Sequence, residues 1–449
     1  MIEVHPDARN SFNRRAAALV EGLSPVDLPK FESRIDWAEP YIEATLSDEN
    51  VVKGPIIQWH KNANGEEDAV WVTVGHTSYL IHGSRFEELE KLADQMQRTG
   101  GLKNVVGYRR VLELLVEWIA EHAQRGSGVP ATDFVIQRIS AALDRYTIVF
   151  PIYELFIEKS FEIGDVRIRA ISGPEIEMWY SQWIEKSPER TTSLKNEIHN
   201  WQKRIQGRAV AECDVTAERE YAVQVALGRV EAALAMLRIF SKGAIFPTAR
   251  SYCTVLGHEN VESINCFIFR NGEFNGNTSQ LRAPEGTFWL LDGRWIDEIM
   301  RSGLADMSAL LKSNRRTEFQ DRAVDALLLY SRCATERTIE GKLIYLFAGL
   351  ESVFLRNQQE PIQDNVSHRL AYVIGHNIED RRRVIKVVKD AYKLRSKFFH
   401  HGASIEEYEQ VRDFMRAAWV FFTGLGRLAF RFESKEQFLE YIEDRRLAG

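Results

Sequence analysis

The sequence predicts an α+β protein, with a mixed α/β region over residues 1–310 followed by an all-helical domain over residues 316–449. Residues 69–82 and 146–170 are rich in β-branched and aromatic side chains, which is typical of strands. Residues 217–241 repeat apolar side chains every three or four positions, as an amphipathic helix does. From about 316 onward the helical periodicity is continuous, and glycine and proline become rare inside the predicted helices.

The N-terminal region alternates between the two periodicities, and we expect it to divide into two lobes near residue 145. Residues 69–82 predict a hairpin that bends near Gly75, and residues 146–170 predict strands with a turn at Gly164 and Asp165. Helices are predicted over 104–124, 131–145 and 217–241, and further strands over 251–256, 264–270 and 286–292.

The C-terminal domain begins after a break near residues 310–316, which we interpret as the domain boundary. Its helices are predicted over 317–335, 338–357, 364–376, 378–399, 405–430 and 434–445.

Composition places the chain among ordinary globular proteins, since 45% of its residues are apolar and 27% are charged. The net charge of −6 excludes a generally basic nucleic-acid coat, so any contact with RNA must come from a local patch. Cys213, Cys253, Cys266 and Cys333 show no C-x-x-C spacing, and we interpret them as buried thiols in a reducing compartment.

Neither a secretory signal nor a membrane span is predicted. The N-terminal residues lack the apolar core of a signal peptide. The longest apolar stretch, residues 417–430, contains Arg427 and is too short for a bilayer of about 30 Å. We therefore expect a cytoplasmic protein that does not contact membranes.

The common phosphate-binding, zinc-protease and nucleophile-elbow motifs are absent from the sequence. His76 and His82 would share one face of a straight strand, but no acidic or thiol ligand accompanies them. We interpret both as ordinary structural histidines, so the sequence predicts neither a metal nor a cofactor.

The segment from Arg381 to Gly402 contains the candidate catalytic and RNA-binding residues. Its apolar stripe, which consists of Val384, Val388, Ala391 and Phe398, also contains Arg395. A guanidinium keeps its charge, so in such a place it requires a carboxylate, a phosphate or a subunit boundary. The alternative is an arginine whose side chain extends past the stripe to water.

A second stripe of the same helix is cationic. Residues 380–401 hold eight Lys or Arg residues against two Asp residues, and a phosphate backbone is the partner that suits such a surface. The alternative is a solvated face that acidic neighbours balance. The predicted RNA-binding residues are Arg382, Lys386, Lys389, Lys393 and Lys397.

His400 lies five residues after Arg395, and His401 and Gly402 follow it. In a straight helix five residues turn through about 500°, which leaves the two side chains about 140° apart. Because glycine ends helices, we expect this helix to fray or kink near His400 and to swing the imidazole round. Alternatively, the pair meets its copy from a second subunit.

The R-x4-H spacing and its context resemble the HEPN superfamily, and most closely its Apea-like branch. The segments that carry the resemblance are LIYLFAGLESVFL (343–355), SHRLAYVIG (367–375) and YKLRSKFFHHG (392–402). A weaker resemblance extends through ELFIEKSFEIGDVRIRAIS (154–172) and AALAMLRIFS (232–241).

The resemblance implies a helical bundle that pairs two subunits across their R-x4-H helices, with metal-independent RNA cleavage or a degenerate version kept for binding. Carried over to this sequence, Arg395 and His400 form the catalytic pair, and Glu351 is the carboxylate that orients Arg395. Ser396 stands where active members often have Asn, Asp or His. His401 lies one position outside the motif.

The leading hypothesis is therefore a homodimeric endoribonuclease of bacterial defence that cuts tRNA or another RNA through attack by the 2′-OH. Residues 1–310 would sense an unknown trigger or restrain the nuclease. The alternative is a non-catalytic HEPN module for dimerisation or RNA binding within a larger complex. An enzyme in the N-terminal region is a third reading, although no nucleophile–base or metal constellation supports it.

Overall fold

A computed structural model describes most of the chain, and it divides into two compact units. Unit 1 comprises residues 1–146 and 215–225, and unit 2 comprises residues 147–214 and 226–449. The described residues are 2–21, 23, 25–26, 56–62, 64–74, 77–126, 128–186, 188, 191–205, 207–257, 263–270, 273–281, 288–401 and 404–448. The boundary predicted near 310–316 falls within unit 2, and as a domain boundary it stays a prediction.

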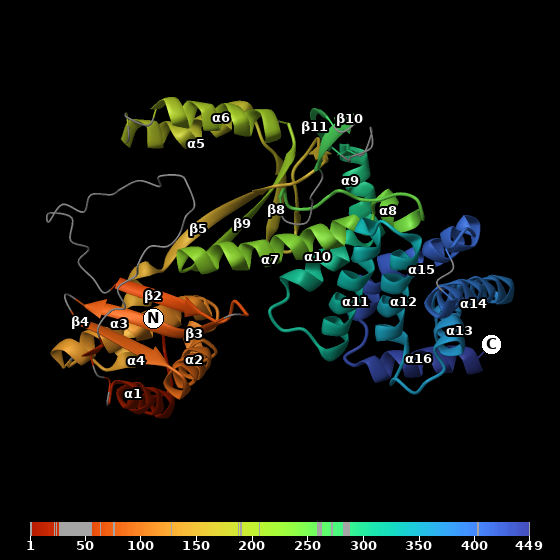
Figure 1. Cartoon of the computed structure of the whole chain (residues 1–449). Coiled ribbons are helices and arrows are strands. Elements are labelled where there is room, and N and C mark those ends of the chain that lie inside the picture. The colour runs from red at the N-terminus through yellow and green to blue at the C-terminus, as the bar shows by residue number, and fades with distance from the viewer. Residues whose placement is uncertain are drawn as a thin grey trace. The chain divides into compact units, whose positions relative to one another are not determined.

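Unit 1 is a small α+β unit built on an antiparallel sheet (Figure 1). The strand order among its described residues is β1-β4-β3-β2, where β1 is Pro25–Val26, β2 is Ile56–Lys61, β3 is Glu67–Val74 and β4 is Thr77–His82. Its helices are α1 (Pro6–Val20), α2 (Ser84–Gln97), α3 (Tyr108–Arg125) and α4 (Ala131–Ala142). Val70, Val72 and Ile81 point from one sheet face into the core that these helices complete.

Unit 2 begins with a second sheet, whose strand order is β5-β9-β8-β7. These strands are β5 (Asp144–Pro151), β7 (Phe161–Ile163), β8 (Val166–Ala170) and β9 (Ala209–Ala217). Two smaller pairings join β6 (Leu155–Ile157) to β12 (Trp289–Leu291), and β10 (Ser263–Arg270) to β11 (Glu273–Leu281). The accompanying helices are α5 (Gly173–Lys186), α6 (Thr191–Ile205), α7 (Arg219–Arg238), α8 (Lys242–Ile245), α9 (Gly293–Ile299) and α10 (Ala305–Lys312). The first residues of β5, the last residues of β9 and residues 219–225 of α7 are counted in unit 1.

The C-terminal part of unit 2 is a group of helices, coloured teal to blue in Figure 1. They are α11 (Glu318–Thr335), α12 (Ile339–Phe354), α13 (Ile362–Ile374), α14 (Ile378–His401), α15 (Tyr408–Ala429) and α16 (Lys435–Leu447). Their starts follow from the sequence, because Thr317, Thr338 and Ser434 cap α11, α12 and α16 with side-chain oxygens.

Aromatic rings fill the space between these helices. Tyr330 stacks on Phe422 with 4.1 Å between ring centroids, and Phe354 lies 4.7 Å from Phe421. Each of these side chains is at most 1% exposed. Such burial contributes about 1.5–3 kcal/mol per large apolar side chain, so this core fixes how α11, α12 and α15 pack.

Arg369 links α13 to neighbouring parts of the helical group through ion pairs and hydrogen bonds. Its guanidinium is 5% exposed and forms a two-bonded pair with Glu360, with distances of 2.7 and 3.0 Å. It also donates to the Phe354 carbonyl and lies 3.8 Å from Glu443 on α16. Hydrogen bonds from Arg369 lower the pKa of Glu360, as expected for a carboxylate held by a cation.

The α+β class is confirmed, and the predicted C-terminal helices all appear with ends shifted by a few residues. The antiparallel pairing predicted within residues 69–82 is also confirmed, as is the turn between β7 and β8, whereas the bend predicted near Gly75 lies outside the described residues. The strand predicted over 251–256 is wrong, because this segment has only one isolated bridge, from Val255 to Ile152. Helices α1, α2, α5 and α6 were not predicted from the sequence.

No helix in the described part of the chain is both long enough and apolar enough to cross a membrane.

Candidate functional site

Arg395 and Glu351 form an ion pair between α14 and α12. The Arg395 Nη1 atom lies 2.5 Å from Glu351 Oε1, and the two side chains are 21% and 22% exposed. The guanidinium also lies over the Phe347 ring, 5.2 Å from its centroid, and 5.9 Å from that of Tyr392. Of the partners that the sequence offered for Arg395, this structure supplies the carboxylate.

The packing around Glu351 fixes the position of this carboxylate. Gly349, two residues earlier, lets α12 approach its neighbours closely, since a Cβ there would lie 2.9 Å from Phe422 Cζ. Phe347 stacks on Phe414 at 4.7 Å and meets Tyr392 edge-on at 5.6 Å. Phe347 and Phe414 are fully buried, so the rings beside the partly exposed Glu351 and Arg395 restrict the orientation of this ion pair.

His400 does not join Arg395 within one chain. Helix α14 continues through His400 to His401, so the prediction that the helix frays or kinks near His400 is wrong. The two side chains consequently leave the helix about 140° apart. Arg395 faces α12, whereas His400 is exposed and lies on the same face as Lys393 and Lys397, seven and three residues earlier.

Ser396 and His401 are the two supporting residues that the sequence predicts next to Arg395 and His400 on α14. Ser396 is half-buried and lies four residues before His400, so on the helix surface it is closer to the imidazole than Arg395 is. A hydroxyl there is able to donate or accept one hydrogen bond. The side chain of His401 lies outside the described residues, as does Gly402.

The basic stripe is exposed, but acidic neighbours balance part of it. Lys386 and Lys393, which are 81% and 70% exposed, both contact Asp390, at 3.3 and 3.2 Å. Lys389 is more enclosed and lies 2.5 Å from Asp364 of α13. Hydrogen bonding from Lys389 lowers the pKa of Asp364.

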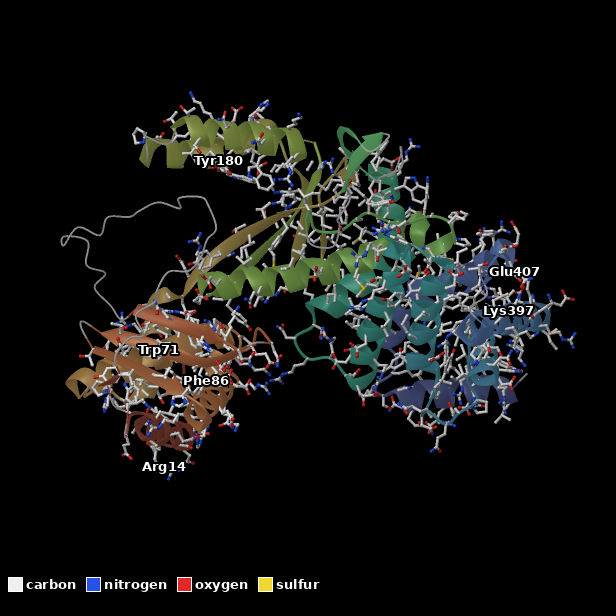
Figure 2. All side chains as sticks on the ribbon, viewed as in Figure 1. Arg14, Trp71, Phe86, Tyr180, Lys397 and Glu407 are labelled. Atoms are coloured by element: carbon white, nitrogen blue, oxygen red, sulfur yellow. The ribbon has the colours of Figure 1, made fainter. Side chains whose placement is uncertain are left out.

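Two further cations of the stripe, Arg382 and Lys397, are also exposed, and Lys397 is labelled on the surface of unit 2 in Figure 2. The helix thus presents one outer face that carries Arg382, Lys386, Lys393, Lys397 and His400. Sequence reasoning identified these cations. It missed that His400 completes the same face, although its position seven residues after Lys393 and three after Lys397 on a continuous helix would have revealed it.

The cysteines and histidines elsewhere in the chain are the remaining candidate groups. Cys213, Cys253 and Cys333 are buried free thiols, and burial raises the pKa of Cys253 and of Cys333 to about 12. His82 is exposed, and His76 lies outside the described residues. Among the described side chains, no group of three or more His, Cys, Asp or Glu residues is arranged to hold a metal ion.

Comparisons of the chain with protein-family models, with curated proteins and with solved structures found no match.

Proposed function

We propose that this protein is a HEPN-type endoribonuclease that cleaves RNA without a metal, using Arg395 and His400. The observation that carries the proposal is the oriented Glu351–Arg395 pair on a helix whose outer basic face ends in His400. The proposed setting is the bacterial cytoplasm, in defence, with tRNA as one candidate target and residues 1–310 as the part that responds to a trigger. This setting rests on the resemblance alone.

The chemistry needs only groups that these residues and RNA supply. A neutral His400 takes the proton of the 2′-OH, whose oxygen then attacks the adjacent phosphorus. An imidazolium from the second subunit protonates the departing 5′-oxygen, which leaves a 2′,3′-cyclic phosphate. Arg395 stabilises the extra negative charge of the phosphorane through its N–H groups.

The geometry of α14 supports the proposal of a dimer, because one chain directs Arg395 and His400 to different sides of the helix. We propose that two copies pair through the C-terminal helices, so that Arg395 of one subunit meets His400 of the other. Light scattering at micromolar concentration should then give twice the 51.7 kDa mass of the chain. A mass of one chain under these conditions would contradict a composite site.

The basic face should bind the phosphate backbone. Reversing two of its charges with Lys386→Glu and Lys393→Glu should weaken binding to every RNA tested. Each lost contact to single-stranded RNA should reduce the slope of log affinity against log salt by about 0.7. Filter binding over a series of salt concentrations measures both effects.

The matched control for this experiment is the pair Lys91→Glu and Arg98→Glu on α2. Lys91 and Arg98 are 64% and 71% exposed, and each contacts a carboxylate one helical turn away, as Lys386 does. RNA binding that is equal in the two double variants would leave the α14 stripe as a solvated face.

The second candidate function is a non-catalytic module for dimerisation or RNA binding. The observation that favours it is the same Glu351 contact, since a guanidinium that a carboxylate holds against Phe347 also fits a purely structural role. Ser396, in place of the residues common in active members, agrees with this alternative.

A further inference from the structure

Helix α6 of unit 2 presents an apolar face to α5 and a polar face to solvent (Figure 1). Leu194, Ile198 and Ile205 lie on one side of the helix and are buried, and Ile198 and Ile205 share a core with Ile176 of α5. The opposite side is exposed along the whole helix. Its charged and amide-bearing residues are Lys195, Asn196, His199, Asn200, Lys203 and Arg204.

No carboxylate balances the cations of this face. Glu197 is the one acidic residue of α6, and it is half-buried rather than on the exposed side. It lies near Tyr180 of α5, since burial and then the charge of Glu197 raise the pKa of that phenol. Within the part of the chain that the structure describes, Lys195, Lys203 and Arg204 form no ion pair with a carboxylate.

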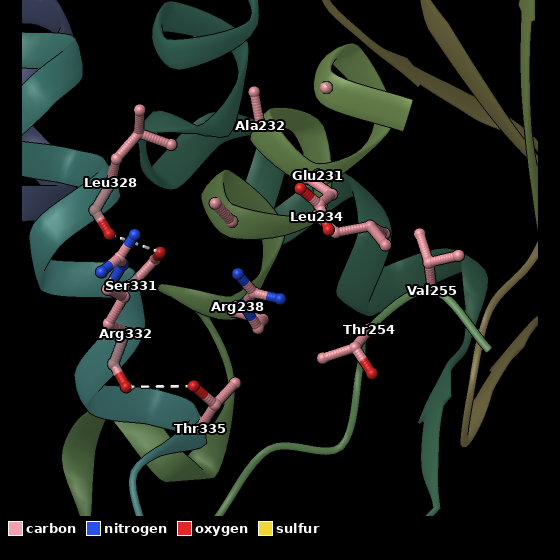
Figure 3. Close-up of a pocket in the computed structure, with 12 residues that line it drawn as sticks. Glu231, Ala232, Leu234, Arg238, Thr254, Val255, Leu328, Ser331, Arg332 and Thr335 are labelled. Atoms are coloured by element: carbon pink, nitrogen blue, oxygen red, sulfur yellow. Dashed lines mark hydrogen bonds between the residues drawn. The ribbon is translucent and has the colours of Figure 1, made fainter. Parts of the chain in front are cut away.

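Several other cations of unit 2 do have partners within the protein. On α14, Lys386 and Lys393 both contact Asp390. A hollow of about 240 Å³ between α7 and α11 is lined in part by Arg238, whose Nη1 donates to the Cys253 carbonyl at 3.2 Å (Figure 3). The charges of the α6 face differ from these, because they remain available to a partner outside the chain.

The helix dipole accounts for only part of the charge on α6. Lys203 and Arg204 lie in the last turn, where cations stabilise the negative end of a helix. Lys195 and His199 lie eight and four residues before Lys203, outside the range of this effect. The stability of the helix therefore does not explain why the cationic side chains continue toward its N-terminal half.

The spacing of this face suits a phosphate chain. Lys195, His199 and Lys203 follow one another at intervals of four residues, so they lie along one side of the helix with a rise of about 6 Å between them. Successive phosphates of one RNA strand are separated by a similar distance. Asn196 and Asn200 lie beside them, and their amides are able both to donate to and to accept from ribose hydroxyls.

We propose that the exposed face of α6 binds the phosphate backbone of single-stranded RNA. Lys195 and Lys203 contact phosphates, and Arg204, whose guanidinium lies over the Trp201 ring at 5.1 Å from its centroid, contacts a third. The fit to a polyanion rests on α6 alone, whereas the choice of RNA rests on the proposed function. The face shares no residue with α14, so it is a second RNA contact of unit 2.

The test is filter binding of a labelled single-stranded RNA to the full chain over a series of salt concentrations. Lys195→Gln combined with Lys203→Gln should weaken binding about tenfold or more at low salt. The slope of log affinity against log salt should fall by about 1.4, because each lost contact to a single strand removes about 0.7. Both side chains are exposed, so thermal unfolding should not change.

Two further proteins are the controls. Lys195→Arg combined with Lys203→Arg keeps both charges and should bind RNA as the unmodified protein does. Lys91→Gln combined with Arg98→Gln on α2 removes two charges from side chains that are 64% and 71% exposed, and it should also retain binding.

Equal RNA binding by the Lys195→Gln, Lys203→Gln protein and by the α2 control would overturn the inference, and it would leave this face to an acidic protein or to solvent. An equal loss of binding in the arginine variant would also overturn it, because the charges would then not be the cause. If only the Lys386→Glu, Lys393→Glu protein binds weakly, the inference fails and the proposed function stands. If the α6 variant binds weakly but the unmodified protein never cleaves RNA, the inference stands and the nuclease fails.

Discussion

His400→Ala should lower the rate of RNA cleavage by about 10²-fold or more, which is the usual effect of removing a general acid–base group. Folding and RNA binding should survive, because His400 is exposed on the outer face of α14 and is not part of the packed core. Single-turnover cleavage with the trigger present, together with thermal unfolding and filter binding, measures the three properties. His401→Ala should have a milder effect, and an essential His401 would mean that the R-x4-H register is wrong.

The products identify the mechanism. Cleavage should persist in EDTA, and the upstream product should end in a 2′,3′-cyclic phosphate. A 2′-deoxy substitution at the cut site should block the reaction, because the proposed nucleophile is then missing.

A mixing experiment tests whether two subunits share the site. Arg395→Ala and His400→Ala chains should each be inactive alone. Because each cleavage uses His400 of both subunits, a dimer of one unmodified chain and one His400→Ala chain lacks one of the two proton-transfer groups. Co-refolding the unmodified chain with an excess of His400→Ala chain should therefore lower the activity by more than the fraction of unmodified chain that is replaced, and activity that stays proportional to the amount of unmodified chain would place each site within a single chain.

The interaction-module alternative predicts a different set of results. The unmodified protein would not cleave RNA even with its trigger, and His400→Ala would alter only binding or assembly. Arg395→Ala would then chiefly destabilise the helical group, because it leaves Glu351 without its partner in a partly buried position.

The free energy of unfolding should rise between about pH 8 and pH 10.5, because the buried side chain of Lys342 loses its proton in the folded protein over this range. This ammonium is 1% exposed and donates to the carbonyls of Gly243 and Cys333, at 2.9 and 2.8 Å. Burial lowers the pKa of Lys342 to about 8, from the ordinary value of 10.5. Below pH 8 the side chain is charged in both states, and only the folded state carries the cost of burying that charge.

Above pH 8 the folded protein releases the proton while the unfolded chain keeps it until about pH 10.5, so the cost disappears over this window. At about 1.4 kcal/mol per pKa unit, the free energy of unfolding should gain about 3 kcal/mol. Urea unfolding at a series of pH values measures this gain relative to Lys342→Met, in which the titrating group is absent.

Lys386→Met is the control for this comparison, because Lys386 is 81% exposed and its replacement should leave the pH profile unchanged. A constant difference between the unmodified protein and Lys342→Met from pH 7 to 10.5 would mean that the two carbonyls stabilise the ammonium enough to offset its burial.

The sequence by itself determined the helical domain, because helical periodicity and end-capping are local properties of the chain. It predicted α11 to α16, the threonine and serine residues that begin three of them, and the apolar stripe that contains Arg395. It also located the cationic face of α14. These features depend on neighbours within one or two helical turns, which the order of residues specifies directly.

Only the tertiary structure decided how these residues meet. The contact of Arg395 with Glu351 crosses from α14 to α12, and that of Lys389 with Asp364 crosses to α13. The burial of Lys342 depends on its contact with Gly243, which lies 99 residues earlier in the chain. The hollow that Arg238 lines depends on the packing of α7 and α11. The direction in which His400 points depends on the residue at which α14 ends. Ending a helix one or two residues earlier or later changes the free energy too little for a sequence pattern to predict the end.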